Sequence, residues 1–276
     1  FGIAHGFIQG AREQYLWKRV QVGSIMSLLT DKNYHNVCRQ KFNYIIVDEA
    51  HHSLADTYIR LFELFPNAKK LGVTATPWRL NHESVLSIYQ YLIVSPQISW
   101  FINNNLLSDF DYVSIKQDSE VQRLVDNSEV ARTGDYSNVD LDNTFNNQRI
   151  RSKLYESYLH FANGRKGIIY AINKLHAAKI AELYSSHGVK AMAIDCDTPR
   201  DVRQQIISAF KNGEISVLVN VDIFTEGFDC PDVNFIQLAR PTTSLSLYLQ
   251  QVGSGLRIVE GKEKTIILDN VGLYNC

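Results

Sequence analysis

The sequence predicts an α/β protein of two domains, each built on a mainly parallel β-sheet. Short apolar runs of strand-forming residues alternate with amphipathic segments of helical length in both halves of the chain. Consecutive strands are separated by crossover-length helical segments, which makes them parallel neighbours. The 276 residues are also enough for two separate hydrophobic cores.

The composition is that of an ordinary globular protein, with 45% hydrophobic and 21% charged residues. The formal net charge of −1 gives no global attraction to nucleic acid or to an anionic membrane, so such a contact requires a local cluster of basic residues. No apolar run approaches the roughly 20 residues that cross a bilayer, and we expect no membrane partner. The four cysteines are far apart and form no Cys-x-x-Cys pair, which favours reduced thiols in a cytoplasmic protein.

The first domain is organised around residues 44–52. Four apolar residues at 44–47 predict a strand buried on both faces, and two acids, Asp48 and Glu49, follow at its end. Ligands of open α/β sheets bind beyond the carboxyl ends of the strands. Two adjacent carboxylates there suit a phosphate-bound magnesium ion, because one can hold the ion while the other orients an attacking water.

Two simpler interpretations of this stretch stay open. A strand followed by a polar turn explains Asp48 and Glu49 without any chemistry, since strand ends commonly carry aspartate. Adjacent histidines, His51 and His52, lack the i, i+4 spacing of a helical zinc site, so a zinc site is disfavoured.

Other polar residues of the first half are expected near these acids. An amphipathic helix at residues 58–65 leads to a second strand that ends in Thr74 and Thr76, and the crossover places both threonines beside Asp48 and Glu49. Residues 20–26 predict a strand that is followed by the start of a helix. Ser24 there could touch a phosphate backbone, although a local capping hydroxyl is the simpler reading.

Periodicity weakens between residues 78 and 150. Residues 126–147 are rich in Asp, Asn, Ser and Thr, which predicts an exposed loop in the connection between the domains. A functional role is the alternative for its stretch Gly134-Asp135-Tyr136-Ser137, but a surface turn is the better prediction.

The α/β alternation returns after residue 151. Strands are predicted at 167–171, 191–194, 215–219, 233–238 and 265–268, and helices at 174–187, 200–211 and 245–251. These elements predict a second parallel-sheet domain.

Five short motifs stand in a fixed order: Asp-Glu-Ala-His at 48–51, Val-Thr-Ala-Thr-Pro at 73–77, and residues 167–171, 220–231 and 250–257. In these motifs the chain resembles the motor core of superfamily 2 DEAD/DEAH-box helicases and translocases, and the resemblance covers nearly its whole length. The branch it resembles most is the bacterial and phage type, which is related to restriction-enzyme Res subunits. They correspond to motifs II, III, IV, V and VI. The resemblance implies two RecA-like lobes with mainly parallel sheets, the first lobe incomplete, with ATP between the lobes and nucleic acid across both. The lobes would be residues 1–104, with motifs II and III, and 105–276, with motifs IV, V and VI.

The resemblance also implies the site residues and cofactors, ATP and Mg²⁺. The catalytic set would be Asp48, which also holds the metal, with Glu49, His51 and Arg257. Nucleotide contacts would come from Gly227, Asp229 and Gln250. Residues that couple nucleotide state to nucleic acid, or lie near the strand, would be Ser24, Thr74, Thr76, Thr225 and Glu226. In this assignment Gln250 and Arg257 come from the motif VI helix; a tight turn at Gly227 and a surface ion pair at Arg257 are the simpler alternatives.

Two departures from the family pattern affect the expected activity. The phosphate-binding motif Gly-x-x-x-x-Gly-Lys-Ser/Thr is absent, since the single Gly-Lys pair, Gly261-Lys262, precedes a glutamate. With no initiator methionine at Phe1, we expect a chain truncated at its N-terminus and inactive alone as an ATP hydrolase. Ser254 stands where motif VI has its first arginine, and a hydroxyl cannot supply the charge of an arginine finger.

Three functions are compatible with these features. The first is an ATP-dependent helicase or translocase motor acting on nucleic acid, DNA rather than RNA, with nuclease or specificity subunits as candidate partners. The second is a non-hydrolysing module, derived from a helicase core, that binds nucleic acid or a partner. The third is an unrelated α/β enzyme that uses Asp48 and Glu49 on another phosphorylated substrate, which leaves the motifs of the second half unexplained.

Overall fold

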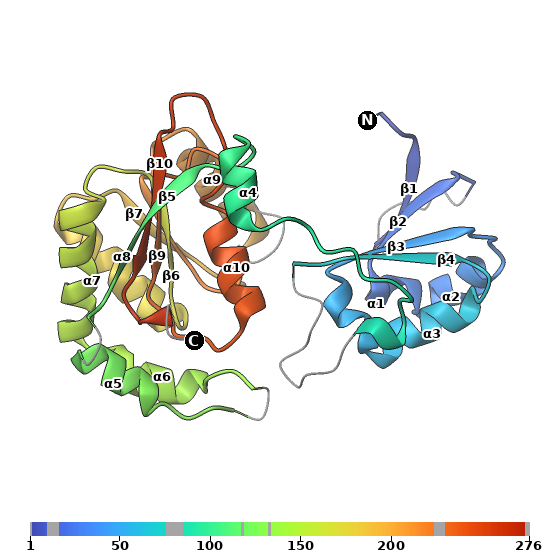
Figure 1. Ribbon diagram of the computed structural model, residues 1–276, viewed down its shortest axis with the longest axis horizontal. Coiled ribbons are helices and arrows are strands. Elements are labelled where there is room, and N and C mark those ends of the chain that lie inside the picture. Colours follow the sequence, from blue (N-terminus) through green and yellow to red (C-terminus); the bar gives the residue numbers. More distant parts are fainter. Residues whose placement is uncertain are drawn as a thin grey trace. The chain divides into compact units, whose positions relative to one another are not determined.

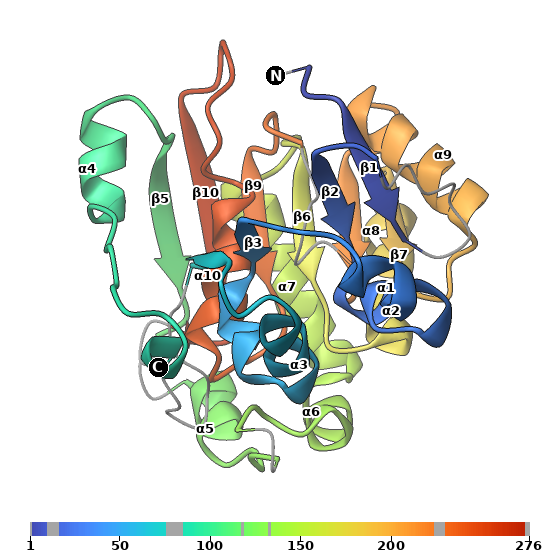
Figure 2. The same ribbon diagram turned by 90° about the vertical axis from the view of Figure 1, so that its right-hand side faces the viewer.

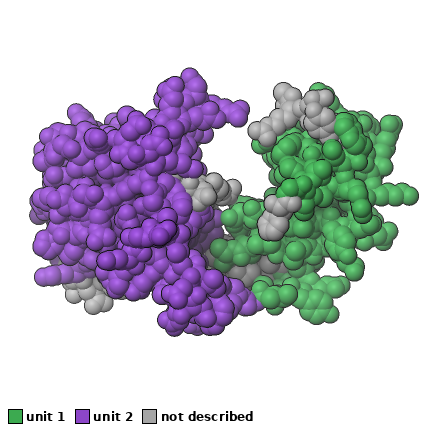
Figure 3. Space-filling view, turned by 90° about the horizontal axis from the view of Figure 1, so that it is seen from above, with its two compact units in different colours: residues 1–93 green, residues 94–276 purple. Residues whose placement is uncertain are grey.

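The computed structural model of the chain describes residues 2–9, 17–75, 85–116, 119–131, 134–223 and 230–273. The chain divides into two compact units, Phe1–Ile93 and Val94–Cys276 (Figure 3). All the strand pairs described in both units are parallel, which confirms the predicted α/β class. The domain boundary expected after residue 104 falls inside unit 2, after helix α4 (Ile98–Asn103).

Unit 1 contains two parallel strand pairs, β1 with β2 and β3 with β4. Its elements are β1 His5–Ile8, β2 Val20–Gly23, α1 Ile25–Leu28, α2 Asp31–Cys38, β3 Tyr44–Asp48, η1 Ala50–Leu54, α3 Asp56–Leu64, β4 Lys69–Val73 and η2 Val85–Ser87, where η denotes a 3-10 helix. The predicted order of strand, helix and strand is therefore confirmed for β3, α3 and β4. Because β3 and β4 are parallel, their carboxyl ends meet at one edge, with Asp48 opposite Val73.

The prediction that β3 is buried on both faces is wrong for this unit. Val47 is 5% exposed and packs with Phe62 of α3, but Tyr44 and Ile46 are 67% and 71% exposed. Alternate residues of a strand point to opposite faces, so α3 covers only the Val47 face. The four apolar residues predicted a strand correctly, but they did not reveal that one face is exposed.

Unit 2 is built on one six-stranded parallel sheet in the order β5-β10-β9-β6-β8-β7 (Figure 2). After α4, its elements are β5 Asp109–Ser114, α5 Glu120–Asp126, α6 Asn138–Phe145, α7 Gln148–Phe161, β6 Gly167–Tyr170, α8 Lys174–Ser186, β7 Ala191–Ile194, α9 Arg200–Lys211, β8 Val217–Asn220, β9 Phe235–Leu238, α10 Leu245–Gly253 and β10 Lys264–Asp269. Each strand and helix predicted after residue 151 is present, with both ends within two residues of the prediction. The second parallel-sheet domain is confirmed.

The two faces of this sheet carry separate hydrophobic cores. Ile169 and Phe235 belong to the core under α7 and α8, whereas Ile168 and Ile236 belong to the core under α9 and α10. Figure 1 shows α7 and α8 on one side of the sheet and α10 on the other. This two-sided cover explains why the strands read as continuous apolar runs.

The exposed loop predicted at residues 126–147 is wrong over residues 138–145, which form α6. Leu141 and Phe145 of this helix are 0% exposed and join the core of unit 2. Because α6 has only eight residues, its stability comes from this burial rather than from an intrinsic preference for helix. The connection is therefore part of the second domain.

Among the described residues, none of the helices is both long enough and apolar enough to cross a membrane.

Candidate active site

The acids that follow β3 lie at a sharp bend of the backbone. Glu49 has φ 50° and ψ 50°, the left-handed region that non-glycine residues rarely adopt, and it directly precedes η1. Its backbone N–H donates to Asp48 Oδ1 at 3.0 Å. Such a conformation costs about 1–3 kcal/mol and is found most often at functional sites. The bend lets the exposed Asp48 and the partly buried Glu49 project from the end of the strand.

His51 connects the end of β3 with the end of β4. Its Nδ1 lies 3.0 Å from Thr74 Oγ1 and 3.3 Å from Glu49 Oε2. The His51 side chain is only 13% exposed, so its ring is held between these two groups. The structure thus brings together Asp48, Glu49, His51 and Thr74, whereas Thr76 lies outside the described residues.

Gly72 explains how η1 can pack so closely on the sheet. A Cβ atom at this position of β4 would lie 2.7 Å from Ala50 Cβ and 2.7 Å from the Tyr89 ring. The Tyr89 hydroxyl in turn lies 3.0 Å from Ser53 Oγ, inside the same buried contact. The absent side chain therefore permits the approach that places His51 next to Thr74.

A cavity of about 610 Å³ in unit 1 is lined by both Ser24 and Asp48. Its remaining walls are mainly apolar side chains from β1 to β3 and α3. Ser24 stands before α1 with an extended backbone, but its side chain makes no capping hydrogen bond. The simpler reading of Ser24 as a capping hydroxyl is therefore wrong.

Motif VI lies in α10 and in the turn after it. Gln250 is in the helix, while Arg257 lies beyond its end at Gly253, so the expectation that both come from the helix is wrong for Arg257. Beyond the helix end, Gly255 packs tightly against β9, since a Cβ atom there would lie 2.7 Å from Ile236 Cγ1. Ser254 donates to the carbonyl of Gln251 at 2.7 Å.

Ser254 also contacts a buried hydroxyl, since its Oγ lies 3.2 Å from Tyr170 OH. Tyr170 is 2% exposed, and burial raises its pKa to about 12. Because the proton of Ser254 goes to Gln251, Tyr170 donates to Ser254. The serine at the arginine position of motif VI therefore satisfies a buried donor.

Lys262, whose pairing with Gly261 superficially suggests a phosphate loop, has a structural role. Its Nζ donates to the carbonyls of Pro231, Gly255 and Arg257 at 3.2, 2.5 and 3.0 Å. Burial lowers its pKa to about 8. The lysine thus ties the end of motif V to the turn after α10.

Motif V is described only at its two ends. Thr225, Glu226, Gly227 and Asp229 lie outside the described residues. Before them, Asn220 Oδ1 accepts from the backbone N–H of Ile223 at 3.2 Å.

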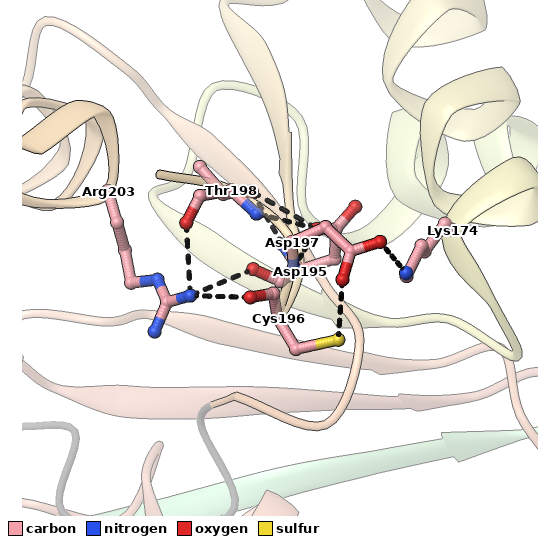
Figure 4. A network of polar contacts seen from close by, with 6 residues as sticks. All are labelled: Lys174, Asp195, Cys196, Asp197, Thr198 and Arg203. Carbon is pink, nitrogen blue, oxygen red and sulfur yellow. Dashed lines mark hydrogen bonds and ion pairs between the residues drawn. The ribbon is translucent and has the colours of Figure 1, made fainter. Parts of the chain in front are cut away.

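A polar network that the sequence analysis missed holds the loop between β7 and α9 (Figure 4). Arg203 Nη2 donates to the carbonyls of Asp195, Cys196 and Thr198, and Asp195 Oδ1 accepts from the backbone N–H groups of Asp197 and Thr198. Lys174 of α8 pairs with Asp197 across the loop. The Asp-x-Asp-Thr-Pro sequence before α9 is the signal that could have predicted this turn. The network orders a loop at the carboxyl edge of the sheet, where β8 also delivers motif V.

The donor set at Asp48 and Glu49 fits a metal ion that arrives with phosphate. Among the described residues, no group of three or more His, Cys, Asp or Glu side chains could hold a metal ion by itself. Magnesium is usually bound by one or two carboxylates together with substrate phosphates, rather than by a complete protein cage. Two adjacent carboxylates at a strand end meet that requirement.

Two family models match the chain in the expected order. Residues 4–79 match the family described as type III restriction enzyme, res subunit, and residues 150–259 match the helicase conserved C-terminal domain. A 51.5 kDa protein of Lactococcus phage (isolate 7-9) is 37% identical over 87% of this chain and 51% of its own length. The Saccharomyces cerevisiae protein named as ATP-dependent helicase IRC3 is 29% identical over 92% of this chain and 37% of its own length. The chain thus spans about half or less of the curated relatives it matches.

Solved structures show the same fold. A fragment assigned as the HsdR subunit of a type I restriction enzyme from Vibrio vulnificus YJ016 superposes with a TM-score of 0.71 at 21% identity, over 99% of this chain and 51% of that one. Dbp5 L327V of S. cerevisiae, bound to RNA and ADP BeF3, gives 0.60 at 16% identity, over 98% of this chain and 64% of that one. The type ISP restriction-modification enzyme LlaBIII, bound to DNA, gives 0.59 at 17% identity, over 91% of this chain and 19% of that one. These matches confirm the expected fold of RecA-like lobes. The two family models, in this order along the chain, show that the chain is a superfamily 2 helicase core, in which a res-type domain is followed by a helicase C-terminal domain.

Proposed function

We propose that this chain is the motor core of an ATP-dependent translocase or helicase that acts on DNA. The observation that supports this most is the position of His51, whose Nδ1 touches both Glu49 and Thr74 at the joined ends of β3 and β4. His51 thereby links Glu49, the acid that orients the water, to Thr74 at the end of β4. A shift of Glu49 on hydrolysis is transmitted to Thr74, and this link is what coupling of hydrolysis to movement requires.

In this mechanism Asp48 would hold the magnesium ion, which would neutralise charge on the nucleotide phosphates when bound. The Glu49 carboxylate orients the attacking water and receives its proton. The strained backbone at Glu49 fixes the direction of that carboxylate before the nucleotide arrives. By the family pattern, Gln250, Gly227 and Asp229 would contact the nucleotide, and Arg257 would supply positive charge to the transferring phosphoryl group. Ser24, Thr225 and Glu226 would act near the nucleic acid, and Thr76 would join Thr74 in linking nucleotide state to nucleic-acid binding.

The choice of DNA rests on the restriction-type relatives. The res-subunit family model and the likeness to an HsdR subunit and to DNA-bound LlaBIII favour DNA, whereas the likeness to Dbp5 shows that the fold also serves RNA. Nuclease or specificity subunits are the partners that such a motor would serve. We test the proposal by measuring ATP hydrolysis by the complete protein with double-stranded DNA, single-stranded DNA and RNA. Stimulation by DNA supports it, and stimulation by RNA alone overturns the choice of DNA.

The 276 residues alone are expected to hydrolyse ATP negligibly. They contain no Gly-x-x-x-x-Gly-Lys-Ser/Thr sequence, so the backbone cradle and lysine for the β and γ phosphates are absent. Magnesium-dependent turnover by the purified chain that is lost in Glu49→Gln would contradict this expectation. Activity is therefore assayed in the complete protein.

The second candidate function is a non-hydrolysing module, and Ser254 is the observation that favours it. Ser254→Arg is expected to raise the DNA-stimulated kcat of the complete protein by about tenfold, equivalent to roughly 1.4 kcal/mol, because a guanidinium there acts on charge that develops in the transition state. DNA affinity should barely change. The same substitution leaves the buried Tyr170 hydroxyl without its acceptor, so the melting temperature should fall.

The control for this substitution is Ser254→Ala, which removes the same hydroxyl without adding charge. It should reproduce the loss of stability and leave kcat unchanged. An unchanged kcat in a folded Ser254→Arg protein would refute the idea that Ser254 marks a missing catalytic charge.

A further inference from the structure

The hairpin that contains Gly134 and Asp135 is not the surface turn that its sequence suggests. Val130 and Tyr136 form an antiparallel bridge, and the Ala131 N–H donates to the Asp135 carbonyl at 2.7 Å. Gly134 has φ 88°, which permits the tight reversal. The Asp135 side chain is only 15% exposed and contacts other residues of unit 2. The first matched family model ends at residue 79 and the second begins at residue 150, so neither covers this hairpin.

The Asp135 carboxylate holds the turn that leads from β9 into α10. Its Oδ1 accepts from Thr242 Oγ1 at 3.0 Å and from the Thr243 N–H at 2.9 Å. The Thr243 hydroxyl donates to the Gly134 carbonyl at 2.6 Å. Thr242 Oγ1 in turn accepts from the Ser244 N–H at 3.0 Å, and Ser244 caps α10 by accepting from the Leu247 N–H. The hairpin therefore fixes the start of the motif VI helix.

The same carboxylate also reaches motif V through one arginine. Arg240 Nη2 lies 3.4 Å from Asp135 Oδ2, and Arg240 Nη1 lies 3.2 Å from Asp222 Oδ1. The Arg240 side chain is 10% exposed and lies between the two carboxylates, of which Asp135 is 15% exposed and Asp222 is 57% exposed. Asp222 has φ 53° and stands just before residues 224–229 of motif V. The arginine thus joins the hairpin to the start of motif V.

We propose that Asp135 is a positioning residue that sets the relative placement of motif V and motif VI. One side chain orders both the Arg240 bridge to Asp222 and the Thr242–Ser244 turn that begins α10. Lys262 joins the last residues of these two motifs, because it donates to the carbonyls of Pro231 and Arg257. Asp135 makes the corresponding connection between the start of motif V and the start of α10. The expected change in kcat rests on the proposed motor function, because these motifs act on kcat only when the nucleotide is hydrolysed.

The test compares Asp135→Asn with Glu120→Ala in the complete protein. The Asp135→Asn side chain would keep an acceptor for Thr242 and Thr243 but lose the charge that holds Arg240. Glu120 is a matched control because its carboxylate pairs on the surface with Arg149 and Lys153, away from the turn. We measure amide hydrogen exchange over residues 217–223 and 240–253, the melting temperature, and kcat and KM for ATP.

The expected result for Asp135→Asn is a local increase in exchange, by about tenfold in these two segments, without a general increase across unit 2. With DNA present, kcat should fall by about tenfold while KM for ATP stays within about twofold. Glu120→Ala should change neither. Thr242→Val removes a hydrogen-bond donor to Asp135 and nearly keeps the shape of the side chain. It should give the same exchange and kinetic pattern in weaker form. If Asp135→Asn does not fold, Thr242→Val is the variant that tests the proposal.

Three outcomes would overturn the inference. Exchange that matches the Glu120→Ala control shows that Asp135 does not order these segments. A uniform rise in exchange with a lower melting temperature shows a merely structural role, and a local rise with an unchanged kcat removes the kinetic consequence. If the wild-type protein hydrolyses no ATP, the motor function fails, and the exchange pattern alone still decides whether Asp135 positions the two motifs.

Discussion

Glu49→Gln is expected to lower the DNA-stimulated kcat of the complete protein by at least about a hundredfold, while ATP binding changes little. General base catalysis by a positioned carboxylate contributes about 10²–10⁴ in rate, and an amide cannot accept the proton of the attacking water. The substitution keeps the size of the side chain and an oxygen that can face His51 Nδ1, now 3.3 Å from Glu49 Oε2. Steady-state hydrolysis and titration with a fluorescent ATP analogue measure the two effects separately.

The matched control is Glu63→Gln, at an exposed position of α3 in the same unit. It should leave kcat and ATP affinity at wild-type values. A kcat for Glu49→Gln within about threefold of wild type would show that another group activates the water. Loss of ATP binding together with kcat would show that Glu49 holds the nucleotide rather than the attacking water.

Acid is expected to destabilise unit 2 through His176, by about 3 kcal/mol between pH 6.5 and 4. His176 is 0% exposed, and its pKa is lowered from 6.5 to about 4, chiefly by burial and also by the nearby charges of Arg151 and Lys179, which Asp142 opposes. Its Nδ1 accepts from the Ile172 N–H at 3.3 Å, so a proton on Nδ1 would face another donor. The unfolded chain binds the proton below about pH 6.5 and the folded chain does not until about pH 4. The stability is therefore complete above pH 6.5 and is lost as the pH falls through this window.

Urea unfolding of the chain, followed by circular dichroism at several pH values from 4 to 7.5, measures this effect. His176→Gln, which keeps an acceptor but no titrating group, should remove the part of the pH dependence that belongs to His176. His187→Gln replaces an exposed histidine at the end of the same helix and should leave the dependence unchanged. A His176→Gln protein with the wild-type pH profile would show that this histidine is not responsible.

The strands and long helices of both units could be predicted because their signals are local. Buried parallel strands such as β6 and β8 consist mainly of consecutive apolar residues, and α9 is followed by the helix-ending pair Asn212-Gly213. The association of motifs II and III also followed from sequence, because one crossover helix between parallel strands leaves little freedom in where their ends meet.

The connection between the lobes could not be predicted, because contacts between residues distant in the sequence stabilise it. Helices α5 and α6 have only seven and eight residues, and both are rich in polar residues. They are stable because Val121 and Val125 of α5, and Leu141 and Phe145 of α6, enter the core of unit 2. Asp135 is separated from Thr242 by 107 residues, so no local pattern reveals their contact. The roles of Ser254 and Lys262 likewise depend on Tyr170 and Pro231, which are distant in sequence.

The measurement that tests the motor function most directly is the affinity of the complete protein for DNA in two nucleotide states. With a non-hydrolysable ATP analogue and with ADP, the dissociation constants should differ by about tenfold, which corresponds to a coupling free energy of roughly 1.4 kcal/mol. Thr74→Val, which removes the hydroxyl 3.0 Å from His51 Nδ1, should bring the ratio of the two constants close to one. Equal affinities in the two states of the wild-type protein would contradict a motor and leave a nucleic-acid-binding module.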